Sequence, residues 1–150
     1  MAKAKTLNLE NIKKEVNKKF KETKKVIFES GEIVVDCHFR QTKKNVLIAE
    51  LMGAIKEAAL QNIELKDVSV INLVGALMVK HFTNLKCNVD GYDELISFNS
   101  VLADGGYLKP IMEAFDIGER TKLMEEVNNS ITFMSNLVKQ STENKVEQGG

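Results

Sequence analysis

The sequence predicts a mainly α-helical protein of the α+β class, in which an N-terminal helix and one β-hairpin precede a bundle of about five helices. Apolar residues recur at spacings of three and four along most of the chain, as they do on one face of a helix. Residues 25–40 alternate with a period of two, which is typical of strands. Between Val68 and Val79 the only polar side chains are Ser69 and Asn72, so we expect this stretch to form a buried central helix.

Size and charge indicate one self-sufficient domain. The chain has 150 residues, 43% of them hydrophobic, which is enough for one core without disulfide bonds. Because 21 basic residues balance 21 acidic ones, the net charge favours neither a nucleic acid nor a membrane as partner, and we expect neither. Cys37 and Cys87 lie far apart, and the N-terminus lacks the apolar core of a signal peptide. We therefore expect a cytoplasmic protein.

Residues 1–24 are predicted to form a basic N-terminal helix or arm. Its apolar residues give only a thin stripe, namely Leu9, Ile12, Val16 and Phe20. Asn8 can cap the helix, because its side-chain oxygen can accept a bond from a free backbone amide. With so thin a stripe, we expect this helix to dock weakly or only on a partner. Its lysines favour a solvated face over the alternative of a phosphate-binding arm.

Residues 25–139 are predicted to form a single α-rich domain that begins with the β-hairpin 25–40. Ser30 and Gly31 are typical turn residues. The second strand presents one apolar face, made of Ile33, Val35, Cys37 and Phe39. Because a lone hairpin is marginal in water, it must lie on the helices or join another sheet. Its outer edge is a candidate for pairing with another subunit.

Two core helices follow the hairpin. The first is predicted over 42–60, with Thr42 as its cap, and the second begins near Asp67. Leu73 and Leu77 of the second helix are predicted to lie in the core. Small residues near the middles of both helices predict a close approach of the two backbones. These residues are Gly53, Ala54, Gly75 and Ala76.

Three helices complete the predicted domain. The first, 92–102, ends at the glycines of 104–106, because glycine readily adopts the left-handed conformation of a C-cap. Residues 107–115 form a short helix. The last helix is predicted over 117–139, and the polar tail, 140–150, is predicted to be disordered.

The last helix carries more apolar surface than one neighbour can cover. A heptad-like stripe runs along it, formed by Ile117, Met124, Val127, Ile131, Met134 and Val138. Further apolar residues lie beside this stripe and need a second surface. We therefore predict that this helix contributes to self-association or to the capture of a client protein. The candidate partner-binding residues are Phe133, Leu137, Met134 and Leu123.

No pattern in the chain indicates catalysis, so we expect no enzymatic activity, no cofactor and no bound metal. Asp36 and His38 share one face of a strand but lack a third ligand, and His81 is expected to be a packed or surface histidine. Residues 88–93 resemble a calcium loop without its spacing, and are predicted to form a turn. The methionines are consistent with an adaptable core or with a groove that accepts varied helices. They include Met52, Met78, Met112, Met124 and Met134.

The chain has a hairpin run, VIFESGEIVVDCHFRQTKKNVLIAELM (26–52), followed by helical sequence that includes DGGYLKPIMEAFDIGER (104–120). This layout resembles that of tail assembly chaperones of long-tailed phages and prophages of Gram-positive hosts. The resemblance covers roughly 25–138 and is one of layout. It implies a protein of the bacterial host cytoplasm that binds the tape measure protein, keeps it soluble and helps tail tube proteins to assemble around it. A homo-oligomer is also expected. The alternative is a homo-oligomeric helical adaptor or regulatory protein without catalytic activity.

Overall fold

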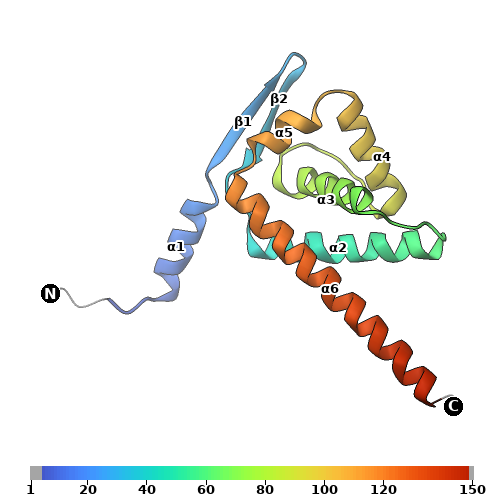
Figure 1. Cartoon of the computed structure of the whole chain (residues 1–150). Coiled ribbons are helices and arrows are strands. Elements are labelled where there is room, and N and C mark those ends of the chain that lie inside the picture. Colours follow the sequence, from blue (N-terminus) through green and yellow to red (C-terminus); the bar gives the residue numbers. More distant parts are fainter. Residues whose placement is uncertain (1–4, 149–150) are drawn as a thin grey trace.

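The computed structural model describes residues 5–148, with side chains described as far as Gln140. Within that range it contains six helices and one two-stranded antiparallel hairpin, which confirms the predicted fold class (Figure 1). The elements are α1 (Leu9–Lys19), β1 (Thr23–Phe28), β2 (Gly31–Asp36), α2 (Gln41–Leu60), α3 (Asp67–Phe82), α4 (Gly91–Asp104), α5 (Leu108–Ala114) and α6 (Ile117–Gln148). The hairpin and the helices α2 to α5 enclose the core, while α1 and the C-terminal half of α6 extend away from it (Figure 1).

Helix α1 forms where the sequence predicted it but packs on almost nothing. The side-chain oxygen of Asn8 accepts a hydrogen bond from the Asn11 amide at 2.9 Å, so the predicted cap is present. No residue of α1 is buried, which confirms that the helix does not dock firmly on its own domain. Its C-terminal end is tethered by Phe20, whose ring lies 4.7 Å from the Arg40 guanidinium and edge-on to His38.

The hairpin is held on the helices through β2. Glu29 and Ser30 form the two-residue loop, because Phe28 pairs with Gly31, so the turn begins one residue earlier than predicted. The outer edge of β2 is covered by the loop after α3, where the Asn84 amide donates to the Val34 carbonyl at 3.0 Å and the Val34 amide donates to the Asn84 side chain at 2.8 Å. The edge of β1 therefore remains the open one among the described residues.

Helix α3 is the centre of the core, as the sequence predicted. Leu73, Leu77 and Phe82 are fully buried, and the ring of Phe82 stacks on that of Phe39 at 4.0 Å between centroids. Phe39 follows β2, so this stack joins the hairpin to α3. The first turn of α3 differs from the prediction: Val68 and Ile71 are 67% and 58% exposed, because α3 begins outside the packed body.

The small residues of the core helices have a different role from the predicted one. A side chain at Gly53 would meet nothing within 4 Å, so α2 and α3 do not approach closely there. A side chain at Gly75 would lie 3.4 Å from the Asn99 amide nitrogen of α4. Gly75 therefore packs against a side chain of α4, that of Asn99, which is itself buried.

Two helix ends also differ from the predictions. Helix α2 begins at Gln41 with Arg40 at the N-cap, so Thr42 lies inside the helix and does not cap it. Helix α6 continues to Gln148, well beyond Lys139, so most of the tail predicted to be disordered is helical. No glycine or proline interrupts the sequence between Glu119 and Gln148, and nothing local ends the helix. The final two residues lie outside the described range.

Candidate partner-binding surface

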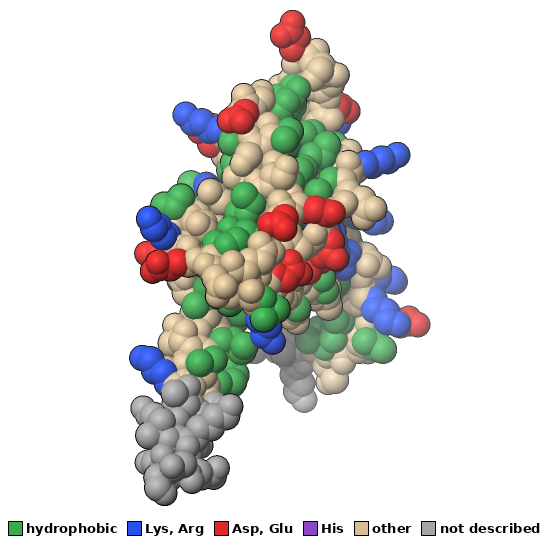
Figure 2. Space-filling view, turned by 90° about the vertical axis from the view of Figure 1, so that its right-hand side faces the viewer, with side chains coloured by type: hydrophobic (Ala, Val, Ile, Leu, Met, Phe, Trp, Pro, Cys, Tyr) green, Lys and Arg blue, Asp and Glu red, His purple; other side chains and the backbone are tan. Residues whose placement is uncertain are grey.

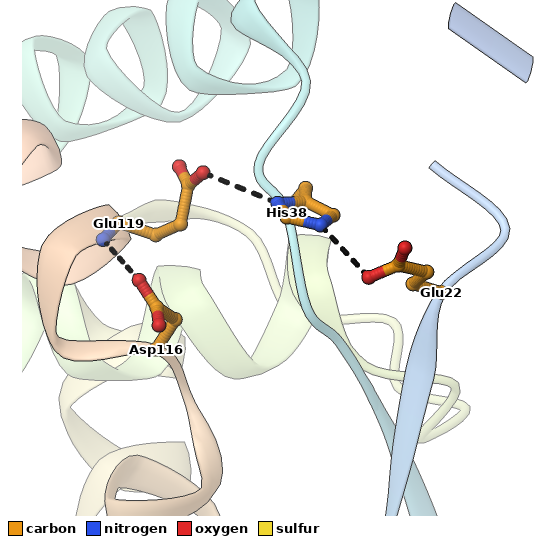
Figure 3. A network of polar contacts seen from close by, with 4 residues as sticks. All are labelled: Glu22, His38, Asp116 and Glu119. Atoms are coloured by element: carbon orange, nitrogen blue, oxygen red, sulfur yellow. Dashed lines mark hydrogen bonds and ion pairs between the residues drawn. The ribbon is translucent and has the colours of Figure 1, made fainter. Parts of the chain in front are cut away.

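The first turn of α6 is fixed by a polar network at the base of the hairpin. The Asp116 carboxylate accepts a hydrogen bond from the Glu119 amide at 3.0 Å and so caps the helix. The Glu119 carboxylate lies 3.5 Å from Nδ1 of His38, whose Nε2 lies 3.0 Å from the Glu22 carboxylate (Figure 3). His38 therefore connects the start of β1 and the end of β2 to the first turn of α6.

A second polar contact holds α6 on α2. Lys44 is 7% exposed, and its Nζ lies 3.0 Å from Oε2 of Glu126. The Gln41 side chain donates to the other oxygen of Glu126 at 2.9 Å. A buried ammonium needs a carboxylate nearby, because removing it from water costs several kcal/mol. The pair therefore fixes the point at which the two helices cross.

Replacing Glu126 by alanine is expected to lower the free energy of unfolding by about 1.5–3 kcal/mol, the range for hydrogen bonds to charged groups. The reason is that Lys44 would remain buried without a carboxylate. Urea denaturation measures the change. The neighbouring Glu125 is exposed, and its replacement by alanine should change stability by no more than about 0.5 kcal/mol. Equal effects of the two substitutions would contradict a structural role of the pair.

Leu123 does not belong to the partner-binding surface that the sequence predicted. Its side chain is fully buried, as is that of Val127 one turn later. Both lie on the face of α6 that packs on the core, and residues four apart share one face of a helix. Leu123 is therefore a core residue.

Beyond Val127, α6 leaves the body of the protein and its apolar residues become exposed. Phe133 is 63% exposed and Leu137 is 44% exposed, and Met134 beside them is half-buried. Figure 2 shows hydrophobic side chains on the lower part of the molecule, toward which α6 runs in Figure 1. Three of the four predicted partner-binding residues therefore lie on a surface that a partner can reach.

A groove lies between this part of α6 and α2. It has a volume of about 390 Å³. Its apolar walls are Met52 and Ile55 of α2 and Ile131, Met134 and Val138 of α6. We call it the α2–α6 groove. Phe133 and Leu137 lie on the adjoining side of α6, so groove and exposed face form one apolar belt around the projecting helix.

A second groove, of about 520 Å³, follows the other flank of α6 and is bounded by α3 and α5. We call it the α3–α6 groove. Ile71 and Ile117 lie on its rim, and Arg120 lines it with a buried Nε that has no hydrogen-bond partner among the described residues. Methionines supply much of its wall, namely Met78, Met112 and Met124.

The methionines were expected to form either an adaptable core or a groove for varied helices, and their positions combine the two. Each of the five methionines singled out from the sequence lines one of them. Met78 is buried and the other four are half-buried, so the same side chains fill the edge of the core and form a deformable surface.

The other candidate side chains lie in separate ion pairs. Asp36 lies 3.6 Å from Lys43, and burial raises the pKa of its carboxyl group although Lys43 and Arg40 partly offset this. His81 lies 3.2 Å from Glu50, as a packed histidine would. Among the described residues there is no group of three or more His, Cys, Asp or Glu side chains placed to hold a metal ion. Within the same residues, no helix has the length and hydrophobicity to cross a membrane.

Comparison with curated proteins and with solved structures gives no match. The profile of one protein family, YomO, matches residues 9–148. This match runs from the start of α1 to the end of α6 and so includes the hairpin, the core and both grooves. The chain therefore belongs to the YomO family, a family of phage-related proteins.

Proposed function

We propose that this protein is a phage tail assembly chaperone, which binds the tape measure protein, keeps it soluble and promotes assembly of the tail tube proteins around it. Membership of a phage-related family supports the phage context. The observation that carries the proposal is the apolar belt on the projecting part of α6, where Phe133 and Leu137 are exposed beside the α2–α6 groove. The role is non-catalytic and belongs to the cytoplasm of the bacterial host.

The geometry of the belt suits a helical client. An amphipathic helix binds by placing its apolar residues, three and four apart, in a groove between helices. The α2–α6 groove offers Met52 and Met134 on opposite walls, and flexible thioether side chains can adjust to different residues along a long client. A long apolar helix aggregates when it is left uncovered, so occupation of this groove would keep the client soluble.

The test is co-expression with the tape measure protein of the same phage. We expect the client to be insoluble alone and to appear in the soluble fraction, bound to this protein, when both are made together. An unrelated aggregation-prone helical protein serves as the control for non-specific solubilisation. If the tape measure protein neither gains solubility nor co-purifies, the chaperone proposal fails.

The alternative is a homo-oligomeric adaptor without a client. The exposed apolar stripe of α1, which buries nothing on its own domain, favours self-association and is compatible with either role. The co-expression experiment separates the two, because an adaptor of this kind would assemble with itself and leave the tape measure protein insoluble.

A further inference from the structure

Helix α1 presents an apolar stripe flanked by positive charge. Leu9, Ile12 and Val16 are 65%, 40% and 39% exposed, although they lie on one face of the helix. At about 100° of rotation per residue, Lys13 lies on one side of this stripe and Lys19 on the other. The two glutamates of α1 lie further round the helix, so positive charge borders the apolar face. We call this surface the basic α1 face.

A surface of complementary chemistry lies on α4. Val89, Phe98 and Val101 line a shallow groove of about 360 Å³, and Val101 is 66% exposed. Asp93 and Glu94 line the same groove and are exposed. Figure 2 shows acidic side chains gathered on the side of the molecule that faces the viewer, which in Figure 1 carries α4 and the C-terminal end of α2. We call this surface the acidic α4 face.

The two faces of one chain lie on opposite sides of the molecule. In Figure 1, α1 is at the left and α4 at the right, with α3 and α6 between them. The acidic α4 face therefore cannot be occupied by α1 of the same chain. The two faces are complementary, because each has an apolar strip and the charges beside it are positive on α1 and negative on α4.

We propose that the basic α1 face of one copy docks on the acidic α4 face of a second copy. Docking would cover apolar side chains that are left exposed in the single chain, and would place Lys13 and Lys19 near Asp93 and Glu94. The two faces differ, so the contact is heterologous and each copy carries one of each kind. None of these residues lines the α2–α6 groove or the α3–α6 groove, so this interface goes beyond the client-binding proposal and does not depend on it.

The test uses charge reversal on each face separately. The first variant carries Lys13→Glu with Lys19→Glu on α1. The second variant carries Asp93→Lys with Ser97→Lys on α4, where Ser97 also lines the groove of the acidic α4 face. Glu94 is left in place, because its carboxylate accepts a hydrogen bond from the Asp90 amide at 2.7 Å. Because like charges would then face each other, each variant alone should have the mass of a single chain, 16.8 kDa, at concentrations where the native protein is assembled. Light scattering coupled to size exclusion measures this, and circular dichroism checks that the variants fold.

Mixing the two variants provides the decisive measurement. The first variant keeps the native acidic α4 face and the second keeps the native basic α1 face, and the two reversed faces are again opposite in charge. The mixture should therefore assemble through contacts between unlike copies, although neither variant assembles alone. Lys14→Glu with Lys18→Glu is the matched control, since both lysines lie on the far side of α1 and the change in net charge is the same. The control should assemble like the native protein, and higher salt should weaken the native assembly.

Three outcomes would overturn the proposal. The native chain could remain a single chain at every concentration, or the Lys13 and Lys19 variant could assemble as well as the control. The third is a mixture of the two variants that forms no assembly, which would place the contact on other surfaces of the protein.

Discussion

Replacing Leu77 by alanine is expected to lower the free energy of unfolding by about 2–5 kcal/mol, the range for truncating a large buried side chain. Leu77 is fully buried in the middle of α3, among residues from the hairpin and from several helices. Truncation would remove favourable contacts and leave a cavity that a close-packed core fills only in part. Chemical denaturation, followed by circular dichroism, measures the change.

Leu60 supplies the matched control for this substitution. It is the last residue of α2 and 84% exposed, so Leu60→Ala makes the same chemical change without a cavity. Its effect should be within about 0.5 kcal/mol. If the two leucine variants unfold at the same denaturant concentration, α3 is not the centre of the core.

The double variant Phe133→Asp with Leu137→Asp is expected to release the tape measure protein while the fold is kept. Both side chains are exposed on the projecting part of α6, so the charges would meet water in the free protein and an apolar helix in the complex. Large apolar residues at the centre of an interface typically contribute 2 kcal/mol or more, which is about a thirtyfold change in Kd. A pull-down with tagged tape measure protein, together with a titration, measures the loss.

The control places the same two charges on the other side of the same helix segment, as Thr132→Asp with Asn136→Asp. Both residues are exposed and polar, so client binding should stay near the native level. Unfolding of the Phe133 and Leu137 variant would mean that these residues belong to the core. If that variant folds and binds normally, the client lies elsewhere, and the α3–α6 groove is the next surface to test.

Periodicity alone identified most elements. Ile33 and Val35 alternate in the sequence and are buried on β2, and the apolar stretch of α3 is buried from Leu73 onward. These predictions succeed because burial on one face imposes a period of two on a strand and of 3.6 on a helix. The capping of α1 by Asn8 was equally predictable, since it depends on residues only three positions apart.

Contacts between distant segments were not predictable in this way. His38 was predicted to share a strand face with Asp36, but β2 ends at Asp36 and His38 lies beyond it. The partners of His38 are Glu22 and Glu119, which only the folded chain brings together. Likewise Gly75 was predicted to face α2, but the side chain that lies against it is Asn99 of α4. A periodic pattern states which face of an element is covered and leaves open what covers it.

The apolar surface of α6 shows both what the sequence predicts and what it leaves open. An apolar stripe wider than one neighbour can cover was evident from the order of residues, and the helical spacing placed Phe133, Leu137 and Leu123 beside it. Which of these three residues are buried and which are exposed depends on where α6 crosses α2, at the Lys44–Glu126 pair. Before that crossing Leu123 faces the core, and after it Phe133 and Leu137 extend past the end of the domain. Helical periodicity repeats identically along a helix, whereas the neighbours of each turn are set by packing in three dimensions.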